Sequence, residues 1–190
     1  MIVNVLTEEH AVAASGGATA NVGAMMELNR ITREQAFMLT AEVFSRRSTC
    51  MRRNVGAVIV VNNRIVSVGY NGAPPGEPHC DGETCVPAGA IGCARAVHAE
   101  INAINYLPKE LIKDPKHLYV TESPCPACAA VIANGPTKNF VSVTYTNEYR
   151  VDSGIKVLIM AKIQVFRLTP SGYVLAKTLE RNGELAERVI

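Results

Sequence analysis

The sequence predicts an α/β fold in which helices flank a central sheet, and three observations carry this prediction. The chain has 190 residues, of which 48% are hydrophobic and 19% charged, so it can bury the core of one domain. A helical pattern and a hairpin pattern open the sequence after its first thirty or so residues. Helices and strands then alternate, which is typical of a sheet covered by helices.

The first elements lie between residues 31 and 70. In residues 31–47 apolar side chains recur at helical spacing, so this segment is predicted to be a helix. Residues 55–61 form a β-branched run, and residues 64–70 alternate between apolar and polar side chains. The Asn62-Asn63 pair between them favours a turn, so the two segments are predicted to be the strands of a β-hairpin.

The later elements follow from the same periodicities. Residues 71–92 hold five glycines and four prolines and are predicted to be a long functional loop. The elements predicted after it are a helix over 96–107, a strand over 117–121, a helix over 125–134, a strand over 140–145, a helix over 153–162 and a strand over 163–168. In residues 172–190 the pair Asn182-Gly183 fits either a hairpin turn or a helix break.

The chain is expected to have three parts. Residues 1–28 include a long run of small residues without a clear period, and are predicted to be a poorly ordered arm or one that docks on a neighbouring subunit. Residues 29–169 are predicted to form the functional domain, and residues 170–190 a C-terminal extension.

Charge and cysteine content narrow the function classes. A formal net charge of +2 argues against strong non-specific binding of nucleic acid, which requires many phosphates to be neutralised. No run approaches the roughly 20 apolar residues of a membrane span, and the N-terminus lacks the basic start of a secretory signal. Six cysteines are too few for a disulfide-stapled chain, so we expect metal ligands or thiols in a reducing compartment, by default the cytoplasm.

Two short segments carry the chemistry, and each opens a predicted helix. One is His98-Ala99-Glu100, and the other is the pair Cys125 and Cys128 after a proline. A Cys-x-x-Cys at a helix start places both sulfurs on one side of a turn, near backbone N–H groups that favour thiolates. With His98 they make three zinc ligands and leave a fourth position for water, which is the catalytic pattern. Glu100 can reach that water without being a ligand, and is predicted to be the catalytic residue.

Each half of this pattern has a simpler interpretation. A lone Cys-x-x-Cys occurs in redox pairs and in structural zinc sites, and a lone His-x-Glu carries little information. Together and in this order they match the signature of zinc nucleobase deaminases, His-x-Glu followed by Pro-Cys-x-x-Cys. That signature predicts hydrolytic attack at C4 of a cytosine ring, with Glu100 carrying a proton to N3 and then helping to protonate the departing amino group.

Four stretches extend the match beyond this signature. They are residues 47–60 (RSTCMRRNVGAVIV), 69–76 (GYNGAPPG), 93–104 (CARAVHAEINAI) and 118–128 (LYVTESPCPAC). With them the sequence resembles, over residues 34–168, the deoxycytidylate (dCMP) deaminases of the zinc-dependent cytidine/deoxycytidylate deaminase superfamily. The resemblance implies a three-layer α/β/α cytidine-deaminase-like fold with a central mixed sheet of about five strands. It also implies a homohexamer that dCTP activates and dTTP inhibits.

The resemblance further implies roles for single residues. Asn71 would hydrogen-bond the sugar hydroxyl, the backbone of Ala99 would hold the base, and Ser123 would lie beside the leaving amino group. Lys109 is the nearest candidate for the phosphate-binding residue that follows the His-x-Glu motif in the family. The regulatory site would include the glycine-rich loop, represented by Gly69, Asn71, Gly72 and Gly76.

A basic cluster supports a phosphate-bearing substrate on independent grounds. Its members are Arg46, Arg47, Arg52 and Arg53. Arginine forks suit phosphate oxygens, but the first two lie at a helix end and can equally be solvated residues that gain from the helix dipole. The last two are preferred, because loop residues at that point can face the site. Tyr145 and Tyr149 are further pocket candidates, although tyrosines on strands and at helix starts more often pack in the core.

The remaining cysteines predict a second metal site. Cys50, Cys80, Cys85 and Cys93 match the ligand count of a closed structural zinc site, with His79 as an alternative ligand. Cys80 and Cys85 lie in the glycine- and proline-rich loop, where a metal clip offsets loop entropy. The resemblance supports a second zinc, and four unrelated buried thiols are the alternative.

The sequence therefore predicts a zinc-dependent dCMP deaminase that makes dUMP for thymidylate synthesis. The alternative within enzymes is a deaminase of other cytosine nucleotides, such as dCTP or 5-substituted dCMP, or of a base in tRNA or single-stranded DNA. A polynucleotide substrate would need a basic groove, and the net charge of +2 argues against one. A non-enzymatic zinc module is the other class, and Glu100 argues against it, because a structural site has no use for that acid.

Overall fold

The computed structural model describes residues 30–80, 93, 95–134, 139–172 and 174–190. The chain divides into two compact units, Met1–Ile31 and Thr32–Ile190, and all helices and strands named below belong to the second. The predicted arm at residues 1–28 lies outside the described residues. None of the helices described is both long enough and apolar enough to cross a membrane.

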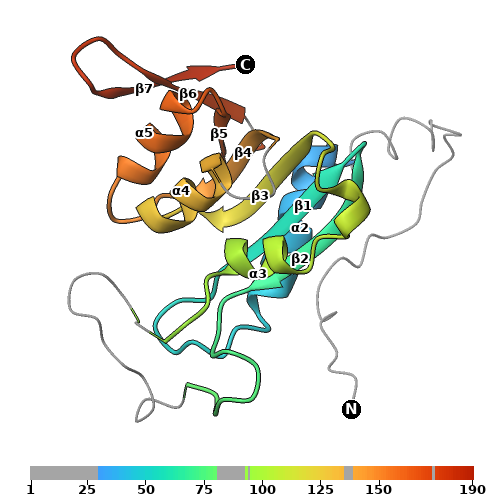
Figure 1. Cartoon of the computed structure of the whole chain (residues 1–190). Coiled ribbons are helices and arrows are strands. Elements are labelled where there is room, and N and C mark those ends of the chain that lie inside the picture. The colour runs from blue at the N-terminus through green and yellow to red at the C-terminus, as the bar shows by residue number, and fades with distance from the viewer. Residues whose placement is uncertain (1–29, 81–92, 94, 135–138, 173) are drawn as a thin grey trace, which may run out of the picture. The chain divides into compact units, whose positions relative to one another are not determined.

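A seven-stranded mixed sheet forms the centre of this unit, with the strand order β2-β1-β3-β4-β5-β6-β7 (Figure 1). The pairs β3–β4 and β4–β5 are parallel, and the other neighbouring pairs are antiparallel. The first hairpin is confirmed, with Asn62 and Asn63 at positive φ in its turn. The strands are β1 (Gly56–Val61), β2 (Arg64–Tyr70), β3 (Lys116–Glu122), β4 (Phe140–Asn147), β5 (Gln164–Leu168), β6 (Val174–Leu179) and β7 (Leu185–Val189).

The predicted sheet of about five strands is too small. The ambiguous C-terminal segment forms a hairpin of β6 and β7, and β6 pairs with β5 as well. Asn182-Gly183 lies in its turn, where Gly183 has a φ of +82°, a conformation that glycine adopts without a steric penalty. The C-terminal hairpin, residues 174–189, therefore extends the sheet.

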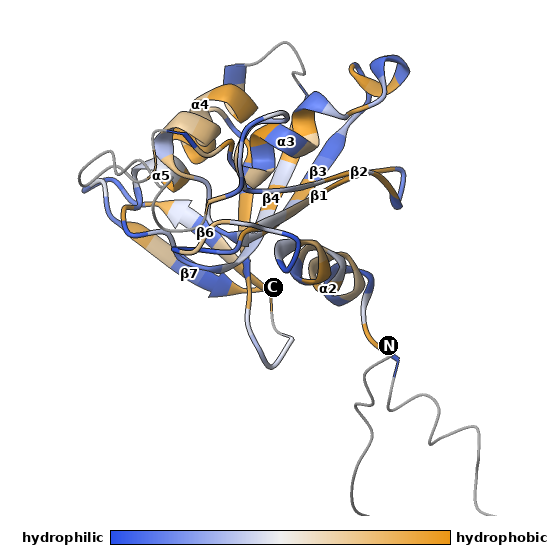
Figure 2. Ribbon diagram, turned by 90° about the horizontal axis from the view of Figure 1, so that it is seen from below, coloured by the Kyte–Doolittle hydropathy of each residue, from blue (hydrophilic) through white to orange (hydrophobic). Residues whose placement is uncertain are grey.

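Helices cover both faces of the sheet, so the three-layer α/β/α architecture is confirmed (Figure 2). α2 (Arg33–Ser45) packs on one face, against β1, β2 and β3. The other face carries α3 (Ala99–Asn105), α4 (Pro126–Asn134) and α5 (Ser153–Met160), with α3 against β1 and β2 and α5 against α4 and β5. A short 3₁₀ turn, η2 (Lys109–Leu111), follows α3.

Alternation along β1 divides the core between the two faces. Ala57 and Ile59 pack on the side of α3, α4 and α5, and Val58 and Val60 pack on the side of α2. All four side chains are at most 2% exposed. Burying a side chain of valine or isoleucine size stabilises the fold by about 1.5–3 kcal/mol, so β1 anchors both layers.

Close packing positions the helix starts that carry the predicted motifs. Gly69 on β2 lies against the first turn of α3, where a Cβ atom would come within 2.2 Å of the Ala99 carbonyl oxygen. Gly154 on α5 lies against the loop before α4, where a Cβ atom would come within 2.0 Å of the Pro124 carbonyl oxygen. Because only glycine lacks a Cβ, these positions let backbone approach backbone directly.

Candidate active site

The three predicted zinc ligands converge at the starts of α3 and α4. His98 is the N-cap residue of α3 and has an extended backbone, because Val97 before it pairs with Gly72 in an isolated bridge. Its Nδ1 atom lies 3.4 Å from Cys125 Sγ and 3.3 Å from Cys128 Sγ. In the part of the chain that the structure describes, these are the only three metal-ligating side chains whose ligand atoms lie within 4.8 Å of one another.

The donor set and its spacing fit a zinc ion. Tetrahedral zinc, with Zn–N bonds of about 2.0 Å and Zn–S bonds of about 2.3 Å, places nitrogen and sulfur about 3.5 Å apart. The two separations between His98 Nδ1 and the sulfurs, 3.4 and 3.3 Å, are close to that value. One imidazole and two thiolates would leave a fourth position for water or substrate, as in catalytic zinc sites.

The two sulfurs and the imidazole form one proton network. Hydrogen bonding from the Cys128 thiol, with a further contribution from His98, lowers the pKa of Cys125 to about 4. The interaction with Cys125, together with burial, raises the pKa of Cys128. The hydrogen bond to Cys125 also raises the pKa of His98. The two thiols therefore titrate as a coupled pair, and binding of a metal dication would release the protons that they still hold.

Glu100 lies in the first turn of α3, two residues after the histidine ligand, and is only 4% exposed. Burial raises the pKa of its carboxyl group, while a backbone hydrogen bond and the nearby His98 partly oppose that shift. A carboxyl group with a raised pKa can hold a proton and return it, which is what a general acid–base catalyst requires.

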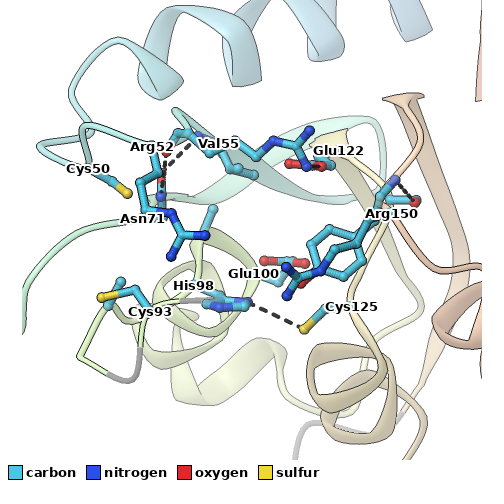
Figure 3. Close-up of a pocket in the computed structure, with 15 residues that line it drawn as sticks. Cys50, Arg52, Val55, Asn71, Cys93, His98, Glu100, Glu122, Cys125 and Arg150 are labelled. Carbon is cyan, nitrogen blue, oxygen red and sulfur yellow. Dashed lines mark hydrogen bonds and ion pairs between the residues drawn. The ribbon is translucent and has the colours of Figure 1, made fainter. Parts of the chain in front are cut away.

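His98, Cys125 and Glu100 line a cavity of about 320 Å³ (Figure 3). A volume of this size suits a small-molecule ligand. Figure 3 shows the side chains of Arg52 and Arg150 reaching into the cavity from opposite walls. The predicted site residues that line it are Cys50, Arg52, Arg53, Asn71, Cys93, His98, Ala99, Glu100, Ser123, Cys125 and Tyr149.

This arrangement agrees with a comparison against protein families. A family model described as the cytidine and deoxycytidylate deaminase zinc-binding region matches residues 31–144. The chain belongs to this family. The matched segment contains the three ligands and Glu100, so the zinc-binding character of the site is shared with the family as a whole.

Individual relatives match over parts of the chain. The chain is 38% identical over 124 residues to ComE operon protein 2 of Bacillus subtilis, covering 65% of this chain and 64% of that protein. It is 41% identical over 113 residues to the deoxycytidylate deaminase of Mycobacterium phage D29, covering 53% of this chain and 85% of that protein. The chain thus spans slightly less than two thirds of the Bacillus protein.

A solved structure supports the fold assignment. It is the dCMP deaminase of cyanophage S-TIM5 in complex with dCMP and dUMP, which is 36% identical to this chain. The superposition has a TM-score of 0.58 and covers 70% of this chain and 95% of the phage chain. The cytidine-deaminase-like fold predicted from the sequence is therefore confirmed.

Two predicted substrate-binding residues lie away from the cavity. Tyr145 is 0% exposed and packs in the core between the sheet and α3–α5, because its position on β4 faces those helices. Lys109 lies in η2, after the C-terminal end of α3, whereas the site is at the N-terminal end of that helix. Neither residue is among the cavity-lining residues that the structure describes.

The glycine-rich loop contributes Asn71 to the cavity wall. Its Oδ1 atom accepts a hydrogen bond from the Val55 N–H at 2.8 Å, and its Nδ2 atom donates to the Arg53 carbonyl oxygen at 2.8 Å. The side chain therefore fixes the segment that carries the cavity arginines. The other predicted regulatory residues, Gly69, Gly72 and Gly76, are not among the described lining residues.

Two charged residues of the cavity wall, Glu122 and Arg150, were not predicted from the sequence. Glu122, at the end of β3, forms an ion pair with Arg53, and the guanidinium of Arg150 lies over the Tyr149 ring at 5.1 Å from its centroid. Glu122 is paired with Asn147 in the β3–β4 register, so residues that follow either strand meet at one edge. The rule that parallel strands end at a common edge could have found Arg150, had the β3–β4 pairing been assumed.

The predicted second metal site is only partly within the described residues. Cys50 and Cys80 are buried, and Cys50 and Cys93 both line the cavity. Figure 3 shows these two cysteines on the side of the cavity beyond Asn71 and His98. Cys85 lies outside the described residues, so the complete set of four thiols stays a prediction.

Proposed function

We propose that this chain catalyses the hydrolytic deamination of dCMP to dUMP and ammonia. The observation that carries the proposal is the ligand group of His98, Cys125 and Cys128 at the edge of a cavity that buried Glu100 and several arginines also line. The names of the phage relatives support dCMP as the substrate. The ligand group and Glu100 would act on the cytosine ring, and the arginines would bind the phosphate.

The ligand group would hold a zinc ion, which when bound supplies an activated water at near-neutral pH. Glu100 takes a proton from the reacting water and places it on N3 of the ring, then takes the remaining proton of the hydroxyl added at C4 and passes it to the departing amino group. The backbone of Ala99 would hold the base, and Ser123 would face the amino group that leaves. Ser123 Oγ already accepts a hydrogen bond from the Tyr149 N–H at 2.8 Å, which fixes its orientation.

Arginines at the cavity wall would hold the 5′-phosphate. Arg52 and Arg150 reach into the cavity, and Arg53 is held at its edge by Glu122. Guanidinium groups bind phosphate oxygens through paired, charge-assisted hydrogen bonds, each worth about 1.5–3 kcal/mol. Asn71 would position the Arg53 segment and offer its remaining lone pair to the sugar hydroxyl.

The test is ammonia release from a panel of cytidine, deoxycytidine, dCMP, CMP, dCTP and 5-methyl-dCMP. We expect dCMP to exceed deoxycytidine in kcat/KM by roughly 10- to 100-fold, which is the worth of one phosphate contact. Glu100→Gln should keep the zinc and the fold but lose turnover by orders of magnitude. Equal values for nucleoside and monophosphate would remove the phosphate assignment, and near-normal turnover in the Gln variant would remove the mechanism.

The same panel addresses the alternative substrates. Preference for dCTP or 5-methyl-dCMP would redirect the proposal to another cytosine nucleotide, and the fold and zinc chemistry would be unchanged. Deamination of a base in tRNA or single-stranded DNA is disfavoured by the net charge of +2. Gel-shift binding to tRNA at moderate salt, without turnover of any mononucleotide, would favour that alternative instead.

We also propose a second, structural zinc and a regulated oligomer. Metal analysis should give two zinc ions per chain, falling to one in a Cys80→Ala, Cys85→Ala double variant. One zinc in the unmodified protein would discard the second site. A homohexamer is expected by light scattering, and dCTP should raise and dTTP lower the rate of dCMP turnover if the glycine-rich loop forms the family's regulatory site.

A further inference from the structure

An ion cluster joins the C-terminal hairpin to the segment that follows β4. Lys177 on β6 has a side chain only 8% exposed, and its Nζ atom lies 2.6 Å from Glu148 Oε1 and 2.7 Å from Glu187 Oε1. Arg167 on β5 donates to both carboxylate oxygens of Glu187, at 2.8 and 2.7 Å. The Tyr145 hydroxyl lies 3.5 Å from the same Glu148 oxygen. Lys177 is thus bound between two carboxylates in a largely desolvated position.

Glu148 is directly followed by two residues of the cavity wall. Tyr149 donates its backbone N–H to Ser123 Oγ at 2.8 Å, and Arg150 lies over the Tyr149 ring. Both residues line the cavity of the active site. Segment 148–150 is therefore held from two sides, by Ser123 at the site and by Lys177 at the hairpin.

Packing alone does not fix this segment on the hairpin side. A second cavity, of about 290 Å³, lies beside it and is lined by Glu148, Tyr149 and Lys177 together with residues of α5 and β7. Where side chains are not close-packed, directional contacts between charged groups carry more of the positioning. Lys177 and Glu148 form such a contact, and both line this cavity.

We propose that Lys177 is a positioning residue, through which the C-terminal hairpin sets the place of Arg150 in the active-site cavity and so the affinity for the phosphate of the nucleotide. The inference rests on the proposed function, because it assumes a phosphate-bearing substrate. Glu148, Arg150 and Lys177 all lie beyond residues 31–144, the segment that the family model matches. The hairpin is accordingly a part of the site that the shared deaminase core does not supply.

The direct test is Lys177→Met, which keeps the length of the side chain and removes its charge. We expect KM for dCMP to rise about tenfold with kcat within twofold, and kcat/KM for deoxycytidine to stay unchanged, because the nucleoside has no phosphate for Arg150 to bind. Lys177→Arg should restore most of the dCMP affinity. The matched control is Lys156→Met, since Lys156 lines the same second cavity but pairs with Asp152 at 3.0 Å on α5. Lys156→Met should leave the kinetic constants for both dCMP and deoxycytidine unchanged.

A purely structural role for Lys177 predicts a different result. Loss of hairpin stability would lower the melting temperature and reduce turnover of dCMP and deoxycytidine in parallel, and that outcome would overturn the proposal. Glu148→Gln covers the case in which Lys177→Met does not fold, because it weakens the same link and leaves Lys177 paired with Glu187. It should show the same selective rise in KM for dCMP.

A double-variant cycle tests the route of the effect. If Lys177 acts through Arg150, adding Lys177→Met to Arg150→Ala should produce no further loss of dCMP affinity. Additive losses would overturn the assigned route. Absence of dCMP turnover in the unmodified protein would instead refute the proposed function. Normal turnover of dCMP, with the ratio of kcat/KM for dCMP to that for deoxycytidine unchanged in Lys177→Met and Glu148→Gln, would refute only the positioning role.

Discussion

Replacing Gly154 with alanine tests whether α5 holds the zinc ligands in place. A Cβ atom there would lie 2.0 Å from the Pro124 carbonyl oxygen and 3.0 Å from the Cys125 carbonyl carbon. Real Cβ contacts do not fall below 3.0 Å, so α5 and the loop must separate by roughly 1 Å. The loop carries the Cys125 ligand directly, whereas α5 carries none.

The magnitude follows from how little a zinc site tolerates. Overpacking of a closed backbone contact costs about 1–3 kcal/mol of stability. Zinc–ligand distances are held within about 0.2 Å, so a shift of about 1 Å at Cys125 exceeds that tolerance several-fold. Loss of outer support typically costs 10- to 100-fold in metal affinity, and we expect a loss in that range for Gly154→Ala. Competition with a chromophoric zinc chelator measures it.

The control is a clash of the same size that lies on the opposite face of the sheet. A Cβ atom at Gly56 would come within 1.9 Å of the Ala41 carbonyl oxygen on α2. Gly56→Ala should therefore lower the melting temperature as much as Gly154→Ala does, with zinc affinity nearly unchanged. Equal zinc affinities in the two variants and the unmodified protein would refute the claim that α5 packing fixes the ligand loop.

Three further variants report on other parts of the structure. Lys116 is fully buried and donates to the carbonyl oxygens of Ile112 and Asp114 at 2.6 and 2.7 Å. Lys116→Met should therefore lower the free energy of unfolding, measured in urea, by about 2–3 kcal/mol and leave turnover at 25 °C unchanged. Hydrogen bonding from Arg167 lowers the pKa of Glu187 to about 2. The ionised Glu187 carboxylate therefore stabilises the fold fully above pH 4.5, and this contribution is lost as the pH falls through 2. The free energies of unfolding of Glu187→Gln and the unmodified protein should therefore differ by about 1–2 kcal/mol at pH 6 and converge near pH 2, and a constant difference would contradict this account. Asn71→Ala should raise KM for dCMP by about tenfold, because the segment carrying Arg53 loses the two hydrogen bonds of the Asn71 side chain. An unchanged KM would show that its other contacts hold this segment in place.

A site residue could be predicted from the sequence where its position depends on neighbouring residues alone. The convergence of His98, Cys125, Cys128 and Glu100 could be predicted because each motif begins a helix, and the geometry of a helix start is set by a few neighbouring residues. Arg150 could not, since its place in the cavity depends on β4 lying parallel to β3. Lys109 was a candidate for binding the phosphate, but it lies beyond the C-terminal end of α3, away from the cavity. Nothing in the neighbouring sequence shows that α3 leads the chain away from the site.

Strand faces and sheet extension were harder still. Tyr145 was named as a cavity candidate, but its side chain points to the face of β4 that the helices cover, and it packs in the core. Alternation along a strand does not show which face the helices cover. The hairpin after residue 172 was left ambiguous because its side chains are mostly half-buried, so its alternation of apolar and polar residues is weak.

The pairing of β1 with β3 has a consequence for the order in which the protein folds. Ala57 lies opposite Val120, so this pairing closes a chain segment of about 60 residues, and contacts of such long range form late. His98 comes before β3 and Cys125 after it, and α3 is docked on β1 and β2, so the ligands meet only once that segment has closed. During refolding, zinc should therefore bind after the secondary structure has formed. Release of zinc from a dye reports binding, and far-UV circular dichroism reports secondary structure. Zinc uptake ahead of the dichroism signal would mean that the ligand loops meet without the sheet.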